Sequence, residues 1–404
     1  MTITERDPFD EFNRVMGAGT GVDPYPALAE LRREAPIHGP ASAPGAAPAA
    51  GLFTAYSFDA VSQVLRDDAT FSSSLYSQVM GPVMGRSILE MDEPEHHAYR
   101  VLLQQAFTRK EMQRWETELV APVVHRLIDG FVVDGEVDLV RSFHFPFPMT
   151  VIAGMMGLPD TLLREFHRLG VELISVSVDM PRATAAAAEL GELFGEQLAD
   201  RRRRIASGTP GDDLISVLAQ AEHDGQRLTD DEIFAFLRLL LPAGAETTYR
   251  SSGNLMAGLL RNPDQLDALR ADRSLLPQAI EEALRWECPL LQIQRMAVRD
   301  GEVCGVGVGA GSVIMVMLGA ANRDEARWDD PDRFDIFRPA RPHVAFASGV
   351  HACLGMHLAR METTVAIGAL LDRLDGLRLA DDEAGAIEGA IFRAPAHLRV
   401  VWDA

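Results

Sequence analysis

The sequence predicts a mainly α-helical protein with a minor β part, an α+β arrangement. Beyond residue 95, apolar residues recur at helical spacing over long stretches, whereas strand-like runs are few and short. Those runs are scattered instead of alternating regularly with helices, which argues against a doubly wound sheet. The length of 404 residues is ample for one large core, and we expect a single domain over residues 1–404.

Helical patterns cover several long segments of the chain. They span residues 96–119, 184–206, 229–260, 276–287 and 356–370. The second segment has a run of arginines near its end, which suits a helix C-terminus. The third begins with Thr229 and Glu232 at the spacing of a capping box. It runs past Pro242 and Gly244, and because proline lacks a backbone N–H we expect a kink there.

Short strands and one loop complete this outline. The strands are expected at Val303–Val308, Ser312–Met317 and Leu398–Trp402. Residues 39–50 are rich in proline, glycine and alanine, which cannot bury much apolar surface. We expect them to form a surface loop, as an insertion within the domain or as a linker.

The chain is strongly acidic, with a net charge of −21. This charge disfavours binding to nucleic acid or to an anionic membrane, and we expect neither as a partner. The sequence has no apolar run of about 18 residues and no basic patch before an apolar stretch at its start, so we expect no transmembrane helix and no signal peptide. Cys288, Cys304 and Cys353 are too sparse for a disulfide framework and favour a cytoplasmic location.

The most informative run surrounds one of these cysteines. It reads Phe346-Ala347-Ser348-Gly349-Val350-His351-Ala352-Cys353-Leu354-Gly355. Gly349 and Gly355 allow a close backbone approach or a positive φ on either side of Cys353. The helix expected from residue 356 places Cys353 near a helix N-terminus, where the dipole favours a thiolate. A lone buried cysteine is most often a packing residue, so it is the surrounding run that favours a ligand here.

This run resembles the signature of the cytochrome P-450 superfamily, Phe-Gly-x-Gly-x-His-x-Cys-x-Gly. Ala347 departs from it by standing where glycine is usual, and we expect a mild effect on the turn. The resemblance implies the cytochrome P-450 fold, with a long oxygen-activating helix over a buried haem b. It also implies that Cys353 ligates the haem iron, that Phe346 packs beside the haem and that His351 contacts a propionate. Gly355 belongs to the same expected cofactor-binding set.

An ExxR motif follows the family's order. Glu282 and Arg285 lie three residues apart on a predicted helix, and Arg338 fits the third position of the family's motif. By itself such a pair is an ordinary surface ion pair. The resemblance implies instead a buried structural network that supports the haem-binding core and takes no part in catalysis.

Three further residues match the family's propionate contacts. His96 and Arg100 lie four residues apart, on one face of a helix start. In isolation they would read as the solvated start of a helix. The resemblance implies that both bind a haem propionate, Arg100 through a charge-assisted hydrogen bond. Arg295 matches the family's propionate-binding arginine after the ExxR helix.

A polar segment interrupts the long apolar helix. It reads Ala243-Gly244-Ala245-Glu246-Thr247-Thr248. Glycine and paired threonines are poor helix formers, and such local violations often mark function, although a kink with a capping role is the alternative. The segment resembles the family's Ala-Gly-x-Asp/Glu-Thr-Thr. The resemblance implies that Ala243 lies beside the haem, that Thr247 hydrogen-bonds bound oxygen and that Glu246 relays protons from solvent.

The substrate pocket can be placed by resemblance alone. Its expected walls are Leu239, Ala243, Leu291, Ile293, Ile391 and Phe392. Its expected roof includes Met80, Val83, Met84, Leu173, Val176 and Met180. For each of these residues a core position is an equally good interpretation. Together they offer no fixed charge, which favours a largely apolar substrate.

Electrons must come from another protein, because no flavin- or iron–sulfur-binding segment is evident. In the family, the segments that hold four basic residues of this chain lie on the face nearest the thiolate: Arg109, Lys110, Arg114 and Arg360. A basic patch on an acidic protein suits docking of an acidic donor, typically a ferredoxin that receives NAD(P)H electrons through its reductase. The alternative is a scattered, solvated set of side chains.

The resemblance implies a monooxygenase that activates O2 and inserts one oxygen atom into its substrate, with hydroxylation as the expected reaction. One alternative is a peroxide-driven haem enzyme or an isomerase, which the intact Glu246 and Thr247 argue against. Another is a non-catalytic relative that binds or recruits other molecules. The intact Cys353 and the ExxR motif argue against that second alternative.

Overall fold

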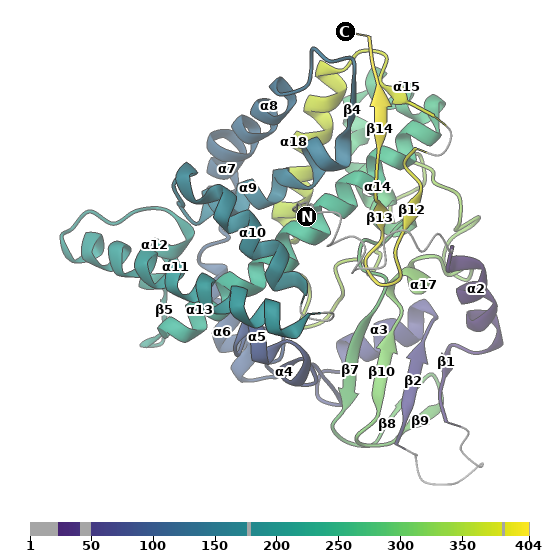
Figure 1. The fold of residues 1–404 in the computed structure, drawn as a ribbon. Coiled ribbons are helices and arrows are strands. Elements are labelled where there is room, and N and C mark those ends of the chain that lie inside the picture. The colour runs from purple at the N-terminus through teal and green to yellow at the C-terminus, as the bar shows by residue number, and fades with distance from the viewer. Residues whose placement is uncertain (1–22, 41–49, 176–178, 382–383, 404) are drawn as a thin grey trace, which may run out of the picture.

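A long helical segment crosses the centre of the molecule, and the other helices and a mixed sheet surround it (Figure 1). The computed structural model describes residues 23–40, 50–175, 179–381 and 384–403. Residues 41–49 of the expected loop, and Val176 of the expected pocket roof, lie outside the described residues. The predicted fold class is confirmed, because helices dominate and the strands are short.

The central segment consists of α13 (Asp230–Leu240), the π-helical turn η5 (Leu241–Glu246) and α14 (Thr247–Arg261). Thr229 and Glu232 form the predicted capping box at its start. Pro242 lies within η5, and the wider π turn accommodates its missing N–H at the point where the sequence predicts a kink. Every residue from Thr248 to Leu260 is buried, so other protein segments enclose α14 on all sides.

Helices that precede the central segment form most of the left side of Figure 1, with α2 and α3 at the lower right. They are α2 (Tyr25–Glu34), α3 (Phe58–Arg66), α4 (Tyr76–Val79), α5 (Gly81–Met84), α6 (Glu95–Gln104), α7 (Arg109–Trp115), η1 (Glu116–Val120), α8 (Ala121–Asp129), η2 (Val140–His144), α9 (Pro146–Met155), η3 (Asp160–Leu162), α10 (Leu163–Ile174), α11 (Met180–Ala206) and α12 (Leu214–Gln220). The helical pattern at 96–119 is therefore divided, because Thr108 caps a new helix with its side chain.

Helices that follow the central segment carry the ExxR motif and lead away from the cysteine run. They are α15 (Pro263–Ala271), η6 (Arg273–Leu275), α16 (Leu276–Trp286), α17 (Leu318–Asn322) and α18 (Met356–Arg373). Both α16 and α18 pack against α14. The predicted helices at 184–206, 276–287 and 356–370 are confirmed, with ends that differ by a few residues.

A mixed five-stranded sheet lies at one end of the molecule, in the order β1-β2-β10-β7-β3. Its strands are β1 (Ile37–His38), β2 (Leu52–Ala55), β3 (Phe71–Ser72), β7 (Ile293–Ala297) and β10 (Val313–Val316). Strands β2 and β10 are parallel, and the other neighbours are antiparallel. Strand β7 lies between β10 and the edge strand β3, and its pairing with β10 fixes Arg295 in register with Ile314.

The remaining strands form small sheets elsewhere. They are β4 (Glu136–Asp138), β5 (Glu222–His223), β6 (Gln226–Arg227), β8 (Gly301–Val303), β9 (Val306–Val308), β11 (Arg378–Leu379), β12 (Ile387–Glu388), β13 (Ala394–Pro395) and β14 (Arg399–Val401). The single strand predicted at Val303–Val308 is wrong, because the chain reverses there as a hairpin of β8 and β9. Cys304 and Gly305 form the turn, with φ of 49° and 82°.

The cysteine run lies between two parts of the hydrophobic core. One part surrounds α14, and Phe346 and Leu354 pack against it. The other lies under the five-stranded sheet, and Ala347 packs against that one. The loop therefore takes its position from both the helical and the sheet part of the molecule.

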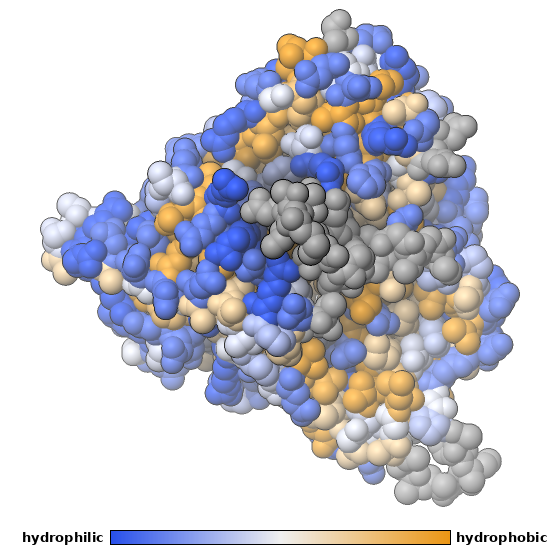
Figure 2. All heavy atoms as spheres, viewed as in Figure 1, coloured by the Kyte–Doolittle hydropathy of each residue, from blue (hydrophilic) through white to orange (hydrophobic). Residues whose placement is uncertain are grey.

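Hydrophilic residues cover most of the helical part of the face shown in Figure 2. Apolar residues gather on that face near the five-stranded sheet, at the bottom of the view. Within the described residues, no helix combines the length and the apolar character that crossing a membrane requires.

Candidate functional site

Backbone hydrogen bonds fold the cysteine loop tightly back on itself. The N–H of Cys353 donates to the carbonyl of Phe346 at 3.0 Å, and the N–H of Ala352 donates to that of Gly349 at 3.1 Å. Gly349 has a φ of +77°, and a Cβ there would lie 2.4 Å from the Leu65 carbonyl oxygen. Only glycine fits at this position, because both its conformation and the close approach of α3 exclude a side chain.

Ala347 takes a conformation that favours glycine. Its φ is +56°, in the left-handed region. An L-residue pays roughly 1–2 kcal/mol for this conformation. The expectation of a mild change at this position is therefore wrong for the backbone, although the methyl group itself packs against the sheet cluster.

Burial dominates the electrostatics of the Cys353 thiol. It raises the pKa of Cys353, and the hydrogen bond from the Gly355 N–H and the charges of Arg100 and Arg360 lower the pKa only in part. The N–H of Gly355, at the start of α18, thus acts in the expected direction, but burial outweighs it among the protein groups. A bound metal cation would supply the missing stabilisation, because a coordinating thiol is deprotonated.

A cluster of cationic and imidazole side chains lies beside this loop, and we call it the cationic cluster: His96, Arg100, Arg295 and His351. The rings of His96 and His351 have centroids 4.3 Å apart. Burial lowers the pKa of His351 to about 3, and the charges of Arg295, His96 and Arg100 add to this effect. The structure thus brings together four sequence-predicted residues from α6, β7 and the cysteine loop.

Among the described residues the cationic cluster has few anionic partners, although Asp92 lies near enough to Arg295 to act on its charge. In the part of the chain that the structure describes, its one paired carboxylate is that of Glu93, 3.1 Å from His96 Nδ1. The Nε2 atoms of His96 and His351 are both buried without a hydrogen-bond partner. Buried polar groups without partners are rare in native proteins, so the cluster fits a ligand that carries carboxylates. Haem has two propionates, and this chemistry fits it.

The open space beside Gly355 also fits haem as the ligand. It caps α18, and no protein atom lies within 4 Å of the position that a Cβ would occupy there. Its φ is ordinary, at −88°. Neither strain nor protein packing therefore requires glycine at this position, and a flat group held against the loop would account for it.

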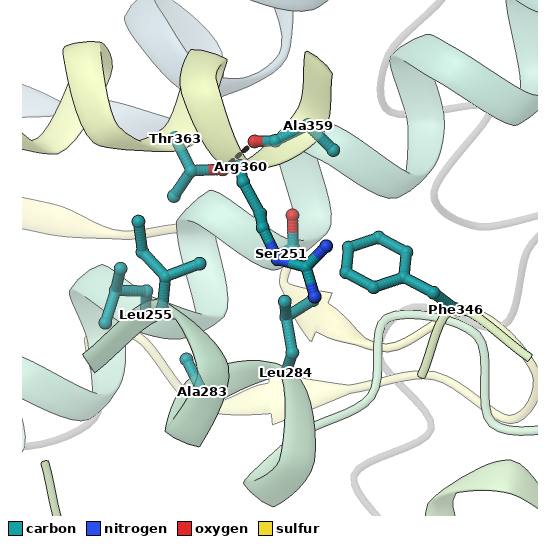
Figure 3. A pocket seen from close by; sticks show the side chains of 9 residues that line it. Ser251, Leu255, Ala283, Leu284, Phe346, Ala359, Arg360 and Thr363 are labelled. Atoms are coloured by element: carbon teal, nitrogen blue, oxygen red, sulfur yellow. Dashed lines mark hydrogen bonds between the residues drawn. The ribbon is translucent and has the colours of Figure 1, made fainter. Parts of the chain in front are cut away.

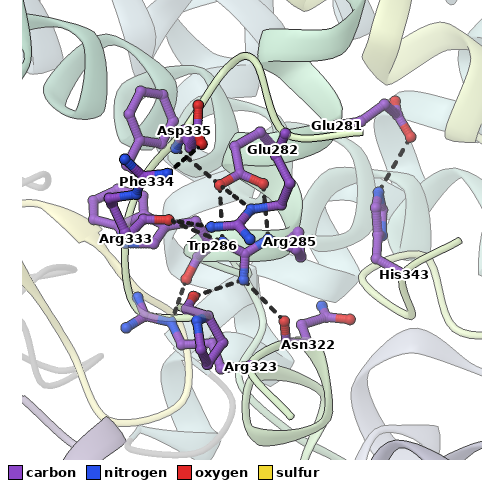
Figure 4. Close-up of polar contacts among 12 residues, drawn as sticks. Glu281, Glu282, Arg285, Trp286, Asn322, Arg323, Arg333, Phe334, Asp335 and His343 are labelled. Carbon is purple, nitrogen blue, oxygen red and sulfur yellow. Dashed lines mark hydrogen bonds and ion pairs between the residues drawn. The ribbon is translucent and has the colours of Figure 1, made fainter. Parts of the chain in front are cut away.

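The ExxR residues form a buried network (Figure 4). Arg285 donates from Nε and Nη2 to the two carboxylate oxygens of Glu282, both at 2.8 Å, and Arg338 Nε donates to the same carboxylate at 3.2 Å. Arg285 Nη1 also donates to the carbonyls of Asn322 and Pro331, at 3.1 and 2.8 Å. The structure thus brings the three predicted members together, with their hydrogen-bonding groups directed at each other and at backbone carbonyls.

Glu281, which the sequence analysis did not single out, is the centre of a second network. Arg360 donates to both of its oxygens, at 2.6 and 2.9 Å, and His343 Nε2 lies 3.2 Å away. These hydrogen bonds hold the pKa of Glu281 at about 2, against the opposing effect of burial. The Arg360 guanidinium lies over the ring of Phe346, 4.6 Å from its centroid (Figure 3).

The expected basic patch is only half available for docking. Arg360 is ion-paired as described, and Arg114 pairs with Glu111 and Asp212 at 2.6 and 2.9 Å. The interpretation of these two arginines as docking cations is therefore corrected, because acidic neighbours neutralise them. Arg109 and Lys110 remain exposed.

Glu246 is buried and paired with an arginine that the sequence analysis did not single out. Its residue exposure is 2%, and Arg250 donates to its Oε1 from Nη2 at 2.9 Å and from Nε at 3.2 Å. Burial raises the pKa of Glu246, and Arg250 offsets part of that rise. Direct contact of Glu246 with solvent is therefore excluded in this conformation. The Glu-x-x-x-Arg spacing was a signal that could have identified this pair.

Thr247 begins α14 one residue further on. Its hydroxyl donates to the Ala243 carbonyl at 2.7 Å, so the hydroxyl proton is engaged while the oxygen keeps a lone pair that can accept. Ala243 itself is exposed although it lies in the middle of the central segment. Its methyl group is therefore accessible to a bound group, which both of its predicted roles require.

Glu362 is a second buried acid near these residues. It lies on α18, and no cation of the described residues pairs with it. Burial raises its pKa to about 8 despite a hydrogen bond with Thr248. The sequence analysis did not single out this residue, and its place in a Met-Glu-Thr-Thr run gave no signal of burial.

The expected substrate-pocket residues separate into different environments. Phe392 lies beside the central segment, where its ring and carbonyl approach Arg250. Leu239 is buried on α13, Ile293 is half-buried at the start of β7, and Ile391 is exposed. Assignment of Leu291 to the pocket is wrong, because it belongs to a small core cluster under α2 and packs against Gly319.

The expected roof is likewise divided. Val83, Met84 and Leu173 are buried members of the main core, which corrects their assignment as roof residues. Met80 is half-buried against the same core, and Met180 is exposed at the start of α11. Tight packing explains the difference, because α5 lies against both α11 and α13.

Comparison with known proteins gives a consistent picture. Residues 176–383 match the family described as Cytochrome P-450. The chain is 42% identical over 303 residues to cytochrome P-450 107B1 of Saccharopolyspora erythraea, which covers 74% of this chain and 72% of that protein. It is 36% identical over 340 residues to a steroid C26-monooxygenase of Mycobacterium tuberculosis, which covers 83% of this chain and 90% of that protein.

Solved structures agree with these relatives. The structure of CYP109E1 from Bacillus megaterium in complex with testosterone matches with a TM-score of 0.84 and 30% identity, over 95% of this chain and 100% of that one. At this identity and coverage, the likeness extends over nearly the whole fold described above.

Replacement of Ala347 by glycine should stabilise the protein. Ala347→Gly relieves the left-handed strain, which should raise the free energy of unfolding by about 1 kcal/mol. The greater conformational entropy of glycine in the unfolded chain offsets part of this gain. Urea unfolding of the two proteins measures this difference. Gly349→Ala is the matched comparison and should destabilise, because its Cβ would meet the Leu65 carbonyl. Equal or lower stability of Ala347→Gly would contradict the analysis.

The buried carboxyl of Glu362 should make stability depend on pH. Its pKa is raised to about 8 in the folded state, so between its unfolded value and 8 the folded protein holds one more proton than the unfolded chain. Stability from this group is complete below the unfolded pKa and is lost as pH rises, by up to about 1.4 kcal/mol per pH unit. Glu362→Gln removes the group. The stability of wild type relative to this variant should therefore fall from pH 5 to pH 8, and a constant difference would show that Glu362 is not buried as a neutral acid.

Proposed function

Because the chain belongs to the cytochrome P-450 family, among whose members is the steroid monooxygenase named above, we propose that it inserts one oxygen atom of O2 into a largely apolar small molecule. Hydroxylation is the expected reaction. The observation that carries this proposal is the position of the Cys353 thiol within reach of the charge of Arg100, in a cationic cluster that has buried imidazole nitrogens without partners.

Haem is the cofactor that these residues fit. Cys353 would ligate its iron, and the cationic cluster would hold its two carboxylates. Phe346, Ala243 and Gly355 would border the ring. When bound, haem supplies the iron centre at which O2 is activated, and a thiolate ligand favours cleavage of the O–O bond.

Thr247 and Glu246 would hydrogen-bond reactants and supply protons at this centre. The Thr247 hydroxyl donates a hydrogen bond to the Ala243 carbonyl, which leaves its oxygen able to accept a hydrogen bond from a bound reactant. Glu246 would store a proton inside the protein, beside that hydroxyl. This pair favours a reaction driven by O2 and external electrons over a peroxide-driven enzyme or an isomerase, and the intact Cys353 disfavours a non-catalytic relative.

Steroids are the first substrate class to test. One relative is named a steroid C26-monooxygenase, and one similar structure holds testosterone. Side chains expected at the pocket of this chain, Phe392, Ile391 and Leu239, are apolar, which suits such a skeleton. A screen of testosterone and other apolar compounds, read by the shift in the haem spin state, identifies the class.

Electrons would come from a ferredoxin that is reduced with NAD(P)H by its reductase. Arg109 and Lys110 are exposed members of the expected basic patch, and within the described residues neither forms an ion pair like those that neutralise Arg114 and Arg360. Docking of an acidic donor would therefore centre on these two residues.

Cysteine replacement tests the ligand assignment. The reduced protein with carbon monoxide should show the red-shifted Soret band of thiolate ligation, and Cys353→His should abolish it. Cys304→Ser is the control, because Cys304 lies exposed in the β8–β9 turn. Loss of the band in the control together with its survival in Cys353→His would reverse the assignment.

Replacement of Thr247 and Glu246 separates oxygen activation from haem binding alone. Thr247→Ala should still bind haem and substrate, but its reducing equivalents should be released as hydrogen peroxide instead of product. Glu246→Gln should slow turnover by about 10²-fold, because a positioned proton donor contributes about that factor or more. The measurement is product formed and peroxide released per reduced nicotinamide consumed. Coupled turnover at wild-type rates in both variants would refute this role and favour the isomerase or peroxide-driven alternative.

A further inference from the structure

The ion pair between Glu246 and Arg250 is almost completely buried. Each side chain is only 1% exposed, and both lie on the central helical segment four residues apart. Both nitrogens of Arg250 that reach Glu246 donate to the same oxygen, Oε1. A buried charge needs a partner of this kind, because the protein interior solvates ions poorly.

Contacts from a distant segment hold Arg250 in turn. Its Nη1 donates to the Phe392 carbonyl at 3.4 Å, and its guanidinium lies 5.5 Å from the centroid of the Phe392 ring. The ring of Tyr249 lies 4.8 Å away on another side. Backbone hydrogen bonds fix the segment around this residue, 391–393, which we call the Phe392 loop. The N–H of Leu291 donates to the Ile391 carbonyl, and the N–H of Arg393 donates to the Pro289 carbonyl. Arg250 therefore joins Glu246 to a loop that we expect to line the substrate pocket.

The second oxygen of Glu246 has no such support. Its Oε2 is buried without a hydrogen-bond partner. The small space beside Glu246 and Ala245 is lined by Phe145, Met149, Val171, Ile174 and Tyr249, which come from η2–α9, α10 and α14. Among the described residues, Arg250 and Tyr249 are the titratable groups whose electrostatics involve Glu246. Helices α9 and α10 line the space beside it with apolar side chains, and Phe392 faces Arg250. The position and charge of Glu246 thus depend on Arg250.

We propose that Arg250 is the positioning residue for Glu246: it fixes one carboxylate oxygen, leaves the other available for a proton, and anchors this arrangement to the Phe392 loop. The acid can exchange its proton only by leaving Arg250 or by admitting water at Oε2. Movement of the Phe392 loop would weaken the hydrogen bonds between Arg250 and Glu246 and so make proton exchange easier. This inference rests on the proposed function for its catalytic meaning, but the positioning itself can be measured without turnover.

The experiment follows the protonation of Glu246 in the haem-loaded protein by infrared difference spectroscopy. Loss of the band in Glu246→Gln assigns the carbonyl stretch of the protonated Glu246 carboxyl. In Arg250→Gln the pH at which half of Glu246 is protonated should rise by about one unit or more, a tenfold change in proton affinity. Arg250→Lys keeps the charge but cannot reproduce both hydrogen bonds, so it should give a smaller rise. An unchanged midpoint in Arg250→Gln would overturn the proposal, and if that variant does not fold, an unchanged midpoint in Arg250→Lys would overturn it.

Turnover supplies an independent readout. Arg250→Gln should reduce kcat about tenfold or more, a larger factor than any change in the apparent affinity for testosterone or for another ligand found in the spin-state screen, because Arg250 touches the Glu246 carboxylate directly and the pocket only through Phe392. The double variant of Arg250→Gln with Glu246→Gln should be no slower than Glu246→Gln alone, because both changes act through one carboxylate. Additive losses would count against positioning. If the wild-type protein shows no turnover but the Glu246 midpoint still moves in Arg250→Gln, the proposed function is refuted and the positioning role stands. If the wild-type protein turns over but the midpoint does not move, the positioning role is refuted and the proposed function stands.

Discussion

The carboxylate of Glu282 determines how the helical part of the molecule meets the cysteine loop. It accepts hydrogen bonds from Arg285 on its own helix, from Arg338, and from the backbone N–H of Asp335 at 2.9 Å. These contacts attach α16 to the segment at 329–338, from which the chain leads directly to the loop. Loss of one partner would leave a buried charge uncompensated, at a typical cost of 3–5 kcal/mol. The position of Cys353 therefore depends on the charged side chains of Glu282, Arg285 and Arg338, which lie outside the loop itself.

Buried charge is handled in three different ways around this site. Glu246 and Arg250 neutralise each other within one helix, and Glu362 has a hydroxyl neighbour and a raised pKa that keeps it protonated near neutral pH. In the cationic cluster, burial lowers the pKa of His351 to about 3 and so keeps its ring neutral, whereas the two arginines and the Nε2 atoms of both histidines face no equivalent set of carboxylates within the described residues. Since proteins rarely tolerate such an imbalance, its location identifies the part of the fold that is completed by a ligand.

Features with a local cause could be predicted from the sequence. The capping box, the ExxR spacing and the glycines of the cysteine loop depend on residues a few positions apart, so their geometry follows from the helix and the turn that contain them. The environments of Leu291, Arg114 and Arg360 could not be predicted, because they depend on segments far away in the sequence. The β8–β9 hairpin was missed because its turn has cysteine, not asparagine or aspartate, before the glycine.

The π turn η5 has a consequence for how the central segment tolerates change in length. Each residue of an α-helix advances the side-chain direction by roughly 100°, and the wider turn offsets the phase of α14 from that of α13. The face of α13 toward α11 and the faces of α14 toward α16 and α18 are therefore set independently. Deletion of one residue within η5 would rotate every side chain of one half against its neighbours, so the number of residues in this stretch is fixed by the packing of both halves.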